Sequence, residues 1–168
     1  LDERIGYYGE QLVLLAQTLG LNTCWVGLSY SKVPGTYVLE DGEKIVCYIA
    51  IGYGETQGVA HKIKTVEQVS RSVMPLDSSK NSCNTTPSWF KKGVEAALLA
   101  PTAVNQQKFS FEYVGMKDGR HQVCAKKGFS MIGYTQLDLG IAKYHFEVGA
   151  GKATGRPGSG NEEDFEWV

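Results

Sequence analysis

The chain has 168 residues, of which 42% are hydrophobic and 21% charged, and its net charge is −1. This length and composition fit one folded domain with a sizeable core and exclude disorder across the whole chain. The near-neutral charge argues against a general nucleic-acid partner, and no apolar run reaches the roughly 18 residues that a membrane span needs.

The first half is predicted to contain a helix, a strand and a short helix. Apolar residues recur at three- and four-residue steps between positions 4 and 19, which predicts an amphipathic helix that stops at Gly20. Residues 21–27 then form a tight link. The run 45–52 is nearly all apolar and rich in β-branched residues, which predicts a strand covered on both faces. Thr65 and Gln68 are spaced as a capping box that opens a short helix.

A segment rich in Ser, Asn, Thr and Lys at 75–86 is predicted to link this half to the next. A helix is then expected to start at Thr86 or Pro87 and to bury a stripe made of Phe90, Val94, Ala97 and Leu98.

Strand-like runs follow at 109–114 and 121–125, joined by a hairpin-type turn at Asp118 and Gly119. Residues 134–149 are helical by period, with Leu137, Ile141, His145 and Val148 on one side. The tail at 151–168 is rich in glycine, and Phe165 and Trp167 could dock it onto a surface.

This order of elements predicts a mixed α+β fold in which helices sandwich a sheet. Strand content is low for the chain length, so we expect the sheet to be incomplete in the chain as given.

Four cysteines occur, and none are spaced as the Cys-x-x-Cys pairs of zinc sites. Cys24 and Cys47 lie in apolar runs, which predicts buried thiols. The pattern suits a reducing compartment better than a secreted disulfide framework, so we expect a cytoplasmic protein.

The first candidate site is the run Ala-Pro-Thr-Ala-Val-Asn-Gln-Gln at 100–107, which follows a predicted helix and precedes a predicted strand. Thr102, Asn105, Gln106 and Gln107 offer hydrogen-bond donors and acceptors without charge. Such a set suits a flat polar heterocycle or a polyol. An ordinary polar loop is the alternative interpretation.

Two further segments could bind a ligand. In an extended chain Lys62 and Lys64, which follow His61, project to the same side, and two ammonium groups there could hold a phosphate. A solvated surface pair is the alternative. Gly27 would let backbone approach a ligand closely. Trp25, next to Val26, would cover a flat ring or fill the core.

A catalytic nucleophile with its base is not visible in the sequence, and neither are the HExxH, P-loop and GxGxxG patterns. His145 on an apolar helix stripe is expected to be structural. Catalysis would therefore depend on a cofactor.

Together these segments resemble the nitroreductase family of flavin-dependent oxidoreductases, over most of residues 5–150. Residues 8–27 resemble a late helix of that family and its Gly-Leu-x-x-x-Trp-x-Gly exit. Residues 49–54 resemble the last core strand, which ends in Gly-Tyr. Residues 95–107 resemble the segment that carries the Ala-Pro-Ser-x-x-Asn-x-Gln motif.

The resemblance implies that the protein binds FMN. Lys62 and Lys64, with His61, would take its phosphate. The flavin edge and ribityl chain would contact Thr102, Asn105, Gln106 and Gln107, and the ring would lie near Trp25, Val26 and Gly27. NAD(P)H would reduce the flavin, which would then reduce a nitroaromatic or quinone in a ping-pong cycle.

The order of these segments is reversed relative to an ordinary nitroreductase, in which the Ala-Pro-Ser motif comes first. We therefore expect an internally duplicated branch, with 1–74 as the late half of a first repeat and 87–150 as a second repeat. Ordinary members are homodimers with flavin at the interface. A pseudo-dimer within one longer chain, or a homo- or hetero-oligomer, is expected here.

Two departures from the family pattern qualify this assignment. Its opening Arg-Arg-Ser-x-Arg segment and a first motif copy do not occur, so we expect this chain to be the C-terminal portion of a longer protein. Gln106, Gln107, Lys108 and Phe109 stand where many relatives have Gln-Pro-Trp. A non-catalytic flavin-binding or structural half is therefore the alternative function.

Overall fold

The computed structural model describes residues 1–73, 86–152 and 165–168. Most of the predicted linker and of the glycine-rich tail lies outside these residues. The helices are α1 (Asp2–Thr18), α2 (Val66–Val69), α3 (Ser88–Ala97), the 3₁₀ turn η1 (Ala103–Asn105) and α4 (Thr135–Ala150). The strands are β1 (Asn22–Val26), β2 (Tyr48–Gly52), β3 (Ser70–Ser72), β4 (Phe109–Lys117), β5 (Arg120–Lys127) and β6 (Phe165–Trp167).

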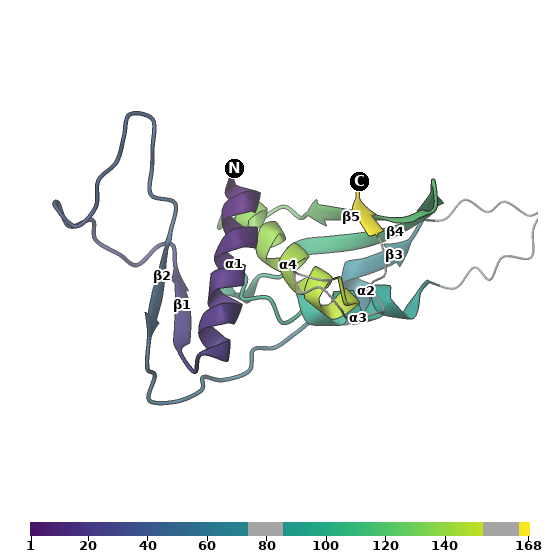
Figure 1. The fold of residues 1–168 in the computed structure, drawn as a ribbon, viewed down its shortest axis with the longest axis horizontal. Coiled ribbons are helices and arrows are strands. Elements are labelled where there is room, and N and C mark those ends of the chain that lie inside the picture. The colour runs from purple at the N-terminus through teal and green to yellow at the C-terminus, as the bar shows by residue number, and fades with distance from the viewer. Residues whose placement is uncertain (74–85, 153–164) are drawn as a thin grey trace, which may run out of the picture.

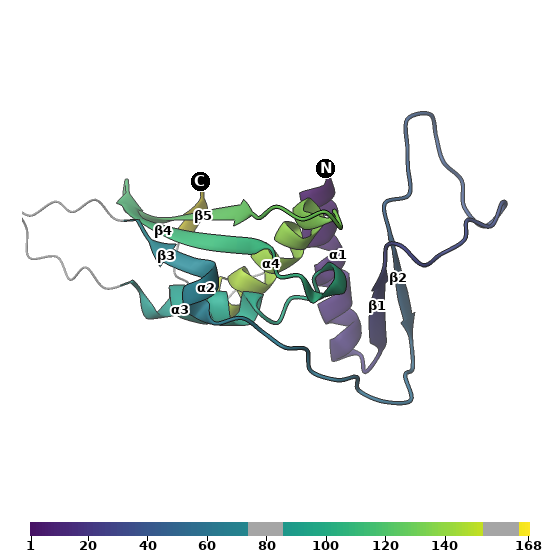
Figure 2. The same ribbon diagram turned by 180° about the vertical axis from the view of Figure 1, so that it is seen from behind.

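A four-stranded sheet in the order β3-β4-β5-β6 forms the main body. β4 and β5 are an antiparallel hairpin, while β3 and β6 each add a parallel strand at an edge. Helices α3 and α4 lie against one face of this sheet, and α1 packs on α4 (Figures 1 and 2). The mixed α+β class is confirmed, and elements from both sides of the predicted linker share one sheet.

Aromatic rings fill the core between the sheet and α3 and α4. Phe111 and Phe146 stack with ring centres 4.7 Å apart, and Trp89 stacks on Phe165 at 5.2 Å. The predicted stripe of α3 is buried, as expected. Phe165 is buried as well and Trp167 donates its indole N–H to Glu147 Oε1 at 2.6 Å, so the docking of the C-terminal end is confirmed.

Helices α1 and α4 approach each other so closely that glycines are required at their contact. A Cβ on Gly6 would lie 2.0 Å from the carbonyl oxygen of Leu137, and one on Gly140 would lie 1.9 Å from that of Glu3. α4 is thus covered by α1, α3 and the sheet together. Near the C-terminal end of α4, Val148 is exposed, although it was predicted to share one side of the helix with Leu137 and Ile141.

Most of the apolar stripe predicted on α1 faces outward, although Ala16 is buried and Ile5 packs against the core. Tyr8, Leu12, Leu15 and Leu19 are each more than half exposed. The buried residues of α1 are Gly6, Glu10, Val13 and Ala16, of which Ala16 alone belongs to the predicted stripe. Close helix contact selects for small residues, so the larger side chains of the predicted stripe lie away from α4.

Strands β1 and β2 form an antiparallel ribbon that stands beside α1, away from the main sheet (Figure 1). Residues 21–27 thus contain a strand rather than a link. The predicted strand at 45–52 is shorter and largely exposed, with Ile51 56% exposed. Cys24 is exposed and Cys47 half-buried, so the prediction of buried thiols was wrong. Within the described residues the ribbon packs mainly on α1, which leaves its other face uncovered.

The segments of the chain that the structure describes include no helix with both the length and the apolar character needed to cross a bilayer.

Candidate functional site

The motif at 100–107 forms a strained turn between α3 and β4. Val104, Asn105 and Gln107 have positive φ angles of 44°, 53° and 45°. Asparagine tolerates such a left-handed backbone, but a β-branched valine rarely adopts it. Strain of this kind costs of order 1–3 kcal/mol per residue and gathers at functional sites. Its surroundings must therefore hold the motif in this shape.

Asp138, in the first turn of α4, holds the motif through two hydrogen bonds. Its Oδ1 accepts the Ala103 N–H at 2.9 Å, and its Oδ2 accepts Gln106 Nε2 at 2.6 Å. The side chain is only 1% exposed. Burial raises the pKa of Asp138, while the two hydrogen bonds act in the opposite direction. Burying a carboxylate costs free energy unless the carboxylate is hydrogen-bonded, so Asp138 favours the position in which both of these bonds form. Asp138 therefore fixes the position of the turn relative to α4.

The polar side chains of the motif also bind one another. Thr102 Oγ1 accepts the Gln107 N–H at 3.0 Å, and Asn105 Oδ1 accepts Gln107 Nε2 at 2.7 Å. Gln106 Nε2 additionally donates to the carbonyl of Gly133 at 3.0 Å. These bonds close the turn on itself and link it to the segment before α4.

The basic segment at 61–64 lies directly on the second half of the motif, some forty residues away in sequence. The carbonyl oxygen of Lys62 accepts both Asn105 Nδ2 and Gln107 Nε2 at 2.8 Å. Lys64 donates its backbone N–H to Gln107 Oε1 at 3.0 Å and its Nζ to the Gln107 carbonyl at 2.5 Å. His61 Nε2 lies 3.1 Å from the Leu98 carbonyl. Two segments predicted to serve one ligand are thus side by side.

The two lysines differ in their surroundings. Lys62 is exposed, whereas Lys64 is half-buried. Burial lowers the pKa of Lys64, and the nearby positive charge of Lys108 lowers it further. The basic side chains of Lys64 and Lys108 therefore lie near each other at the end of the motif.

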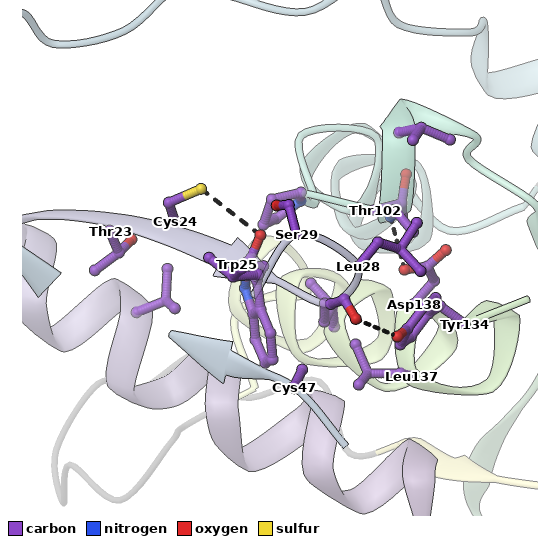
Figure 3. A pocket seen from close by; sticks show the side chains of 17 residues that line it. Thr23, Cys24, Trp25, Leu28, Ser29, Cys47, Thr102, Tyr134, Leu137 and Asp138 are labelled. Atoms are coloured by element: carbon purple, nitrogen blue, oxygen red, sulfur yellow. Dashed lines mark hydrogen bonds between the residues drawn. The ribbon is translucent and has the colours of Figure 1, made fainter. Parts of the chain in front are cut away.

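A cavity of about 480 Å³ opens beside the first half of the motif (Figure 3). Its volume lies within the range of roughly 300–1,000 Å³ that small-molecule sites occupy. β1, the motif, α1 and α4 all contribute to its walls. The lining residues are Val13, Thr23, Cys24, Trp25, Val26, Gly27, Leu28, Ser29, Cys47, Pro101, Thr102, Ala103, Val104, Tyr134, Leu137, Asp138 and Ile141.

The predicted site residues therefore divide into two groups. Trp25, Val26, Gly27 and Thr102 line the cavity. The other six residues lie outside its lining. Asn105, Gln106 and Gln107 form the second half of the motif, Lys62 and Lys64 bind to it, and His61 lies at the end of α3.

Gly27 and Tyr134 meet at one end of the cavity. Tyr134 donates its hydroxyl to the carbonyl of Gly27 at 2.7 Å. A Cβ on Gly27 would lie 3.0 Å from Tyr134 Cζ, so the glycine makes room for the phenol ring. Tyr134 itself has a φ of 59°, a left-handed value immediately before α4. The carbonyl of Gly27, where backbone was expected to approach a ligand, thus accepts a hydrogen bond from the protein itself.

Sequence reasoning missed Tyr134 and Asp138. The available signals were weak: an acidic residue in the first turn of a predicted helix, and a tyrosine after a glycine. Both have ordinary explanations in helix capping and turns. In the described part of the chain, no cluster of His, Cys, Asp and Glu side chains could hold a metal ion.

Comparison with known proteins fits this arrangement. A family model described as "Putative TM nitroreductase" matches residues 1–150. The chain belongs to this nitroreductase family. No curated protein sequence matches it.

This nitroreductase-family chain also resembles a solved structure, described as a "putative nitroreductase" from Thermotoga maritima. The two share 25% sequence identity with a TM-score of 0.60, and the match covers 88% of this chain. It covers 54% of the Thermotoga protein, so the chain spans about half of that protein's length.

Proposed function

We propose that this protein is an FMN-dependent oxidoreductase that uses NAD(P)H to reduce a nitroaromatic, quinone or similar acceptor. The observation that carries the proposal is the cavity beside a strained polar motif in a nitroreductase-family chain. The described residues that line the cavity include two thiols, Cys24 and Cys47, as well as hydroxyls and the Asp138 carboxylate, but no histidine or lysine that could act as a base for them. Burial raises the pKa of Cys47, which disfavours its thiolate.

The cavity suits the ring end of FMN. Trp25, Leu137 and Ile141 give it apolar walls, and flat heterocycles bind well against aromatic and aliphatic side chains. Thr102 adds a hydroxyl, although that oxygen already accepts the Gln107 N–H. A hydroxyl can still donate its own hydrogen to a ligand.

The basic segment suits the phosphate end. Lys62 is exposed and Lys64 and Lys108 lie close by, so an anion there would meet several positive charges. The amides of Asn105 and Gln107 are already bonded to the carbonyl of Lys62. We therefore assign these amides to holding the basic segment in place, and the lysines to the phosphate. The Nζ of Lys64 already donates to the Gln107 carbonyl, but an ammonium group has three N–H donors and can also bind an anion.

FMN, when bound, would supply the two-electron chemistry, by taking hydride from NAD(P)H and passing it to the acceptor in a ping-pong cycle. The chain's own residues would bind and orient it. Asp138 holds the motif against α4, and Trp25 and Tyr134 close two sides of the cavity.

The exposed stripe of α1 supports an assembly larger than this chain. The exposed side chains of this stripe form an apolar face, and such faces mark sites of contact with other protein surfaces; they are Tyr8, Leu12, Leu15 and Leu19. We propose that another part of a longer, internally duplicated protein, or another subunit, covers it. Light scattering of the purified protein would test this, since a stable monomer of this chain alone would contradict the oligomer.

The phosphate assignment can be tested by titration with FMN and with riboflavin, which lacks the phosphate. Changing Lys62 and Lys64 together to Ala should weaken FMN binding by about tenfold or more and leave riboflavin binding nearly unchanged. The double change of Lys32 and Lys117 to Ala is the control, because it removes the same charge from exposed sites elsewhere. Unchanged FMN affinity in the first variant would refute the assignment. A wild-type protein that takes up no FMN would favour a structural half.

A further inference from the structure

A buried carboxylate lies behind the cavity wall and is bonded to two other elements. Glu10 of α1 is 1% exposed. Its Oε1 lies 2.8 Å from His145 Nε2 on α4, and its Oε2 accepts the indole N–H of Trp25 at 3.0 Å. Neither Glu10 nor His145 lines the cavity, whereas Trp25 does. The pair is therefore joined to the cavity by the hydrogen bond between Glu10 and Trp25.

The helix geometry places this pair one turn beyond the cavity floor. Val13 and Ile141 line the cavity; Glu10 comes three residues before Val13, and His145 four residues after Ile141. Residues three and four apart lie on the same side of a helix. The indole of Trp25 extends from β1 toward α1, so it spans from the cavity to the carboxylate (Figure 3).

Gly9 restricts the ring of Trp25 from the other side. A Cβ at Gly9 would lie 2.4 Å from Trp25 Cη2, a distance that real side chains do not reach. The ring therefore lies directly on the backbone of α1 while its N–H is held by the neighbouring residue. Two successive positions of α1 thus fix where the indole can be.

We infer that Glu10 and His145 are positioning residues that hold the Trp25 indole as a cavity wall and so set how well a flat aromatic ring fits. His145 occupies the second carboxylate oxygen and fixes the direction of the first. Site side chains held by buried hydrogen bonds keep their geometry better than free ones do. The inference rests on the proposed function for the identity of the ligand, but the position of Trp25 can be measured without one.

The experiment compares Glu10→Ala and Glu10→Gln. Glutamine keeps an oxygen for the indole N–H, and its amide can donate to a neutral His145, so it should bind FMN within about twofold of wild type. Alanine loses both contacts, and we expect FMN affinity to fall about three- to tenfold. Emission from Trp25, identified by difference from Trp25→Phe, should shift in Glu10→Ala with no FMN present.

A matched control is available on the same two helices. Glu147 is also a buried carboxylate, and it accepts the indole N–H of Trp167 together with the hydroxyl of Tyr7. Trp167 does not line the cavity. Glu147→Ala should therefore destabilise the fold but leave FMN affinity unchanged, which separates lost stability from lost positioning.

The double variant decides whether Glu10 acts through Trp25. In the Trp25→Phe background, which lacks the indole N–H, Glu10→Ala should produce no further loss of FMN affinity. An equal loss in both backgrounds would overturn the inference, as would an unshifted Trp25 emission. If wild type binds no FMN, the proposed function fails, and the emission and acrylamide quenching of Trp25 alone decide the positioning role.

Discussion

Removing the Asp138 carboxylate should destabilise the protein by releasing the motif. In Asp138→Ala, the Ala103 N–H and the Gln106 amide lose their acceptor. Each partly buried donor left unpaired costs about 1–3 kcal/mol, and relief of the buried charge offsets part of the sum. We expect the free energy of unfolding to fall by about 2–4 kcal/mol in urea denaturation.

Asp138→Asn should cost less, about 1–2 kcal/mol, because one oxygen can still accept the Ala103 N–H. The new amide N–H₂ would meet Gln106 Nε2, another donor, where the oxygen now lies 2.6 Å away. Turning the Gln106 amide over would instead bring its oxygen against the Gly133 carbonyl. One hydrogen bond is lost in either case. Asp41→Ala in an exposed loop is the control and should stay within about 0.5 kcal/mol of wild type.

The pH dependence of the same variants follows from the raised pKa of Asp138. The folded protein holds this proton more tightly than the unfolded chain, whose Asp pKa is about 3.9. The resulting stabilisation is complete below that value and is lost as pH rises through the folded-state pKa. Asp138→Asn should therefore lose more stability relative to wild type in acid than at neutral pH. A difference in stability that does not change with pH would contradict the raised pKa of Asp138. An Asp138→Ala variant whose stability is within about 0.5 kcal/mol of wild type would refute the anchoring of the motif by Asp138.

Three further predictions concern strain, helix contact and the core. Val104→Asn should stabilise the protein by about 0.5–1 kcal/mol in urea, since asparagine tolerates a φ of 44°; a loss would mean that the motif stores no strain there. Gly6→Ala should lower the thermal midpoint sharply, because its Cβ would collide with the Leu137 carbonyl, whereas Gly52→Ala meets open space and should change little. Phe165→Ala should cost about 3–5 kcal/mol by calorimetry, and an effect under about 1 kcal/mol would mean that the end of the chain is not part of the core.

Local signals in the sequence predicted much of the main body. Thr65 and Gln68 form the expected capping box, and Asp118 and Gly119 turn the β4–β5 hairpin with φ angles of 52° and 81°. These features depend on neighbours in sequence. The buried stripe of α3 could be predicted for the same reason.

Features set by distant partners could not be predicted. Periodicity shows that α1 has an apolar face, but contact with α4 depends on Gly6 and Gly140 matching across about 130 residues, and sequence periodicity carries no such information. Glu10 sits on the buried side because His145 and Trp25 meet it there. The apolar run at 45–52 indicated a strand, but whether a strand is buried depends on the elements that pack on it, and β2 is largely exposed.

The candidate site shows the same division. The motif and the Lys62–Lys64 pair were predicted to serve one ligand, and the structure brings them together. Asp138 was missed because its contact with Ala103 spans 35 residues. The assignment of Lys62 and Lys64 to the FMN phosphate, the internal duplication and the partner that covers α1 stay predictions.

The absorbance spectrum of the purified protein, recorded with FMN before and after NAD(P)H under anaerobic conditions, tests the central claim most directly. The proposed function predicts that the protein retains a yellow flavin through gel filtration, that NAD(P)H bleaches it, and that a nitroaromatic or quinone restores the colour. A protein that retains no flavin, or whose bound flavin NAD(P)H does not bleach, would contradict it.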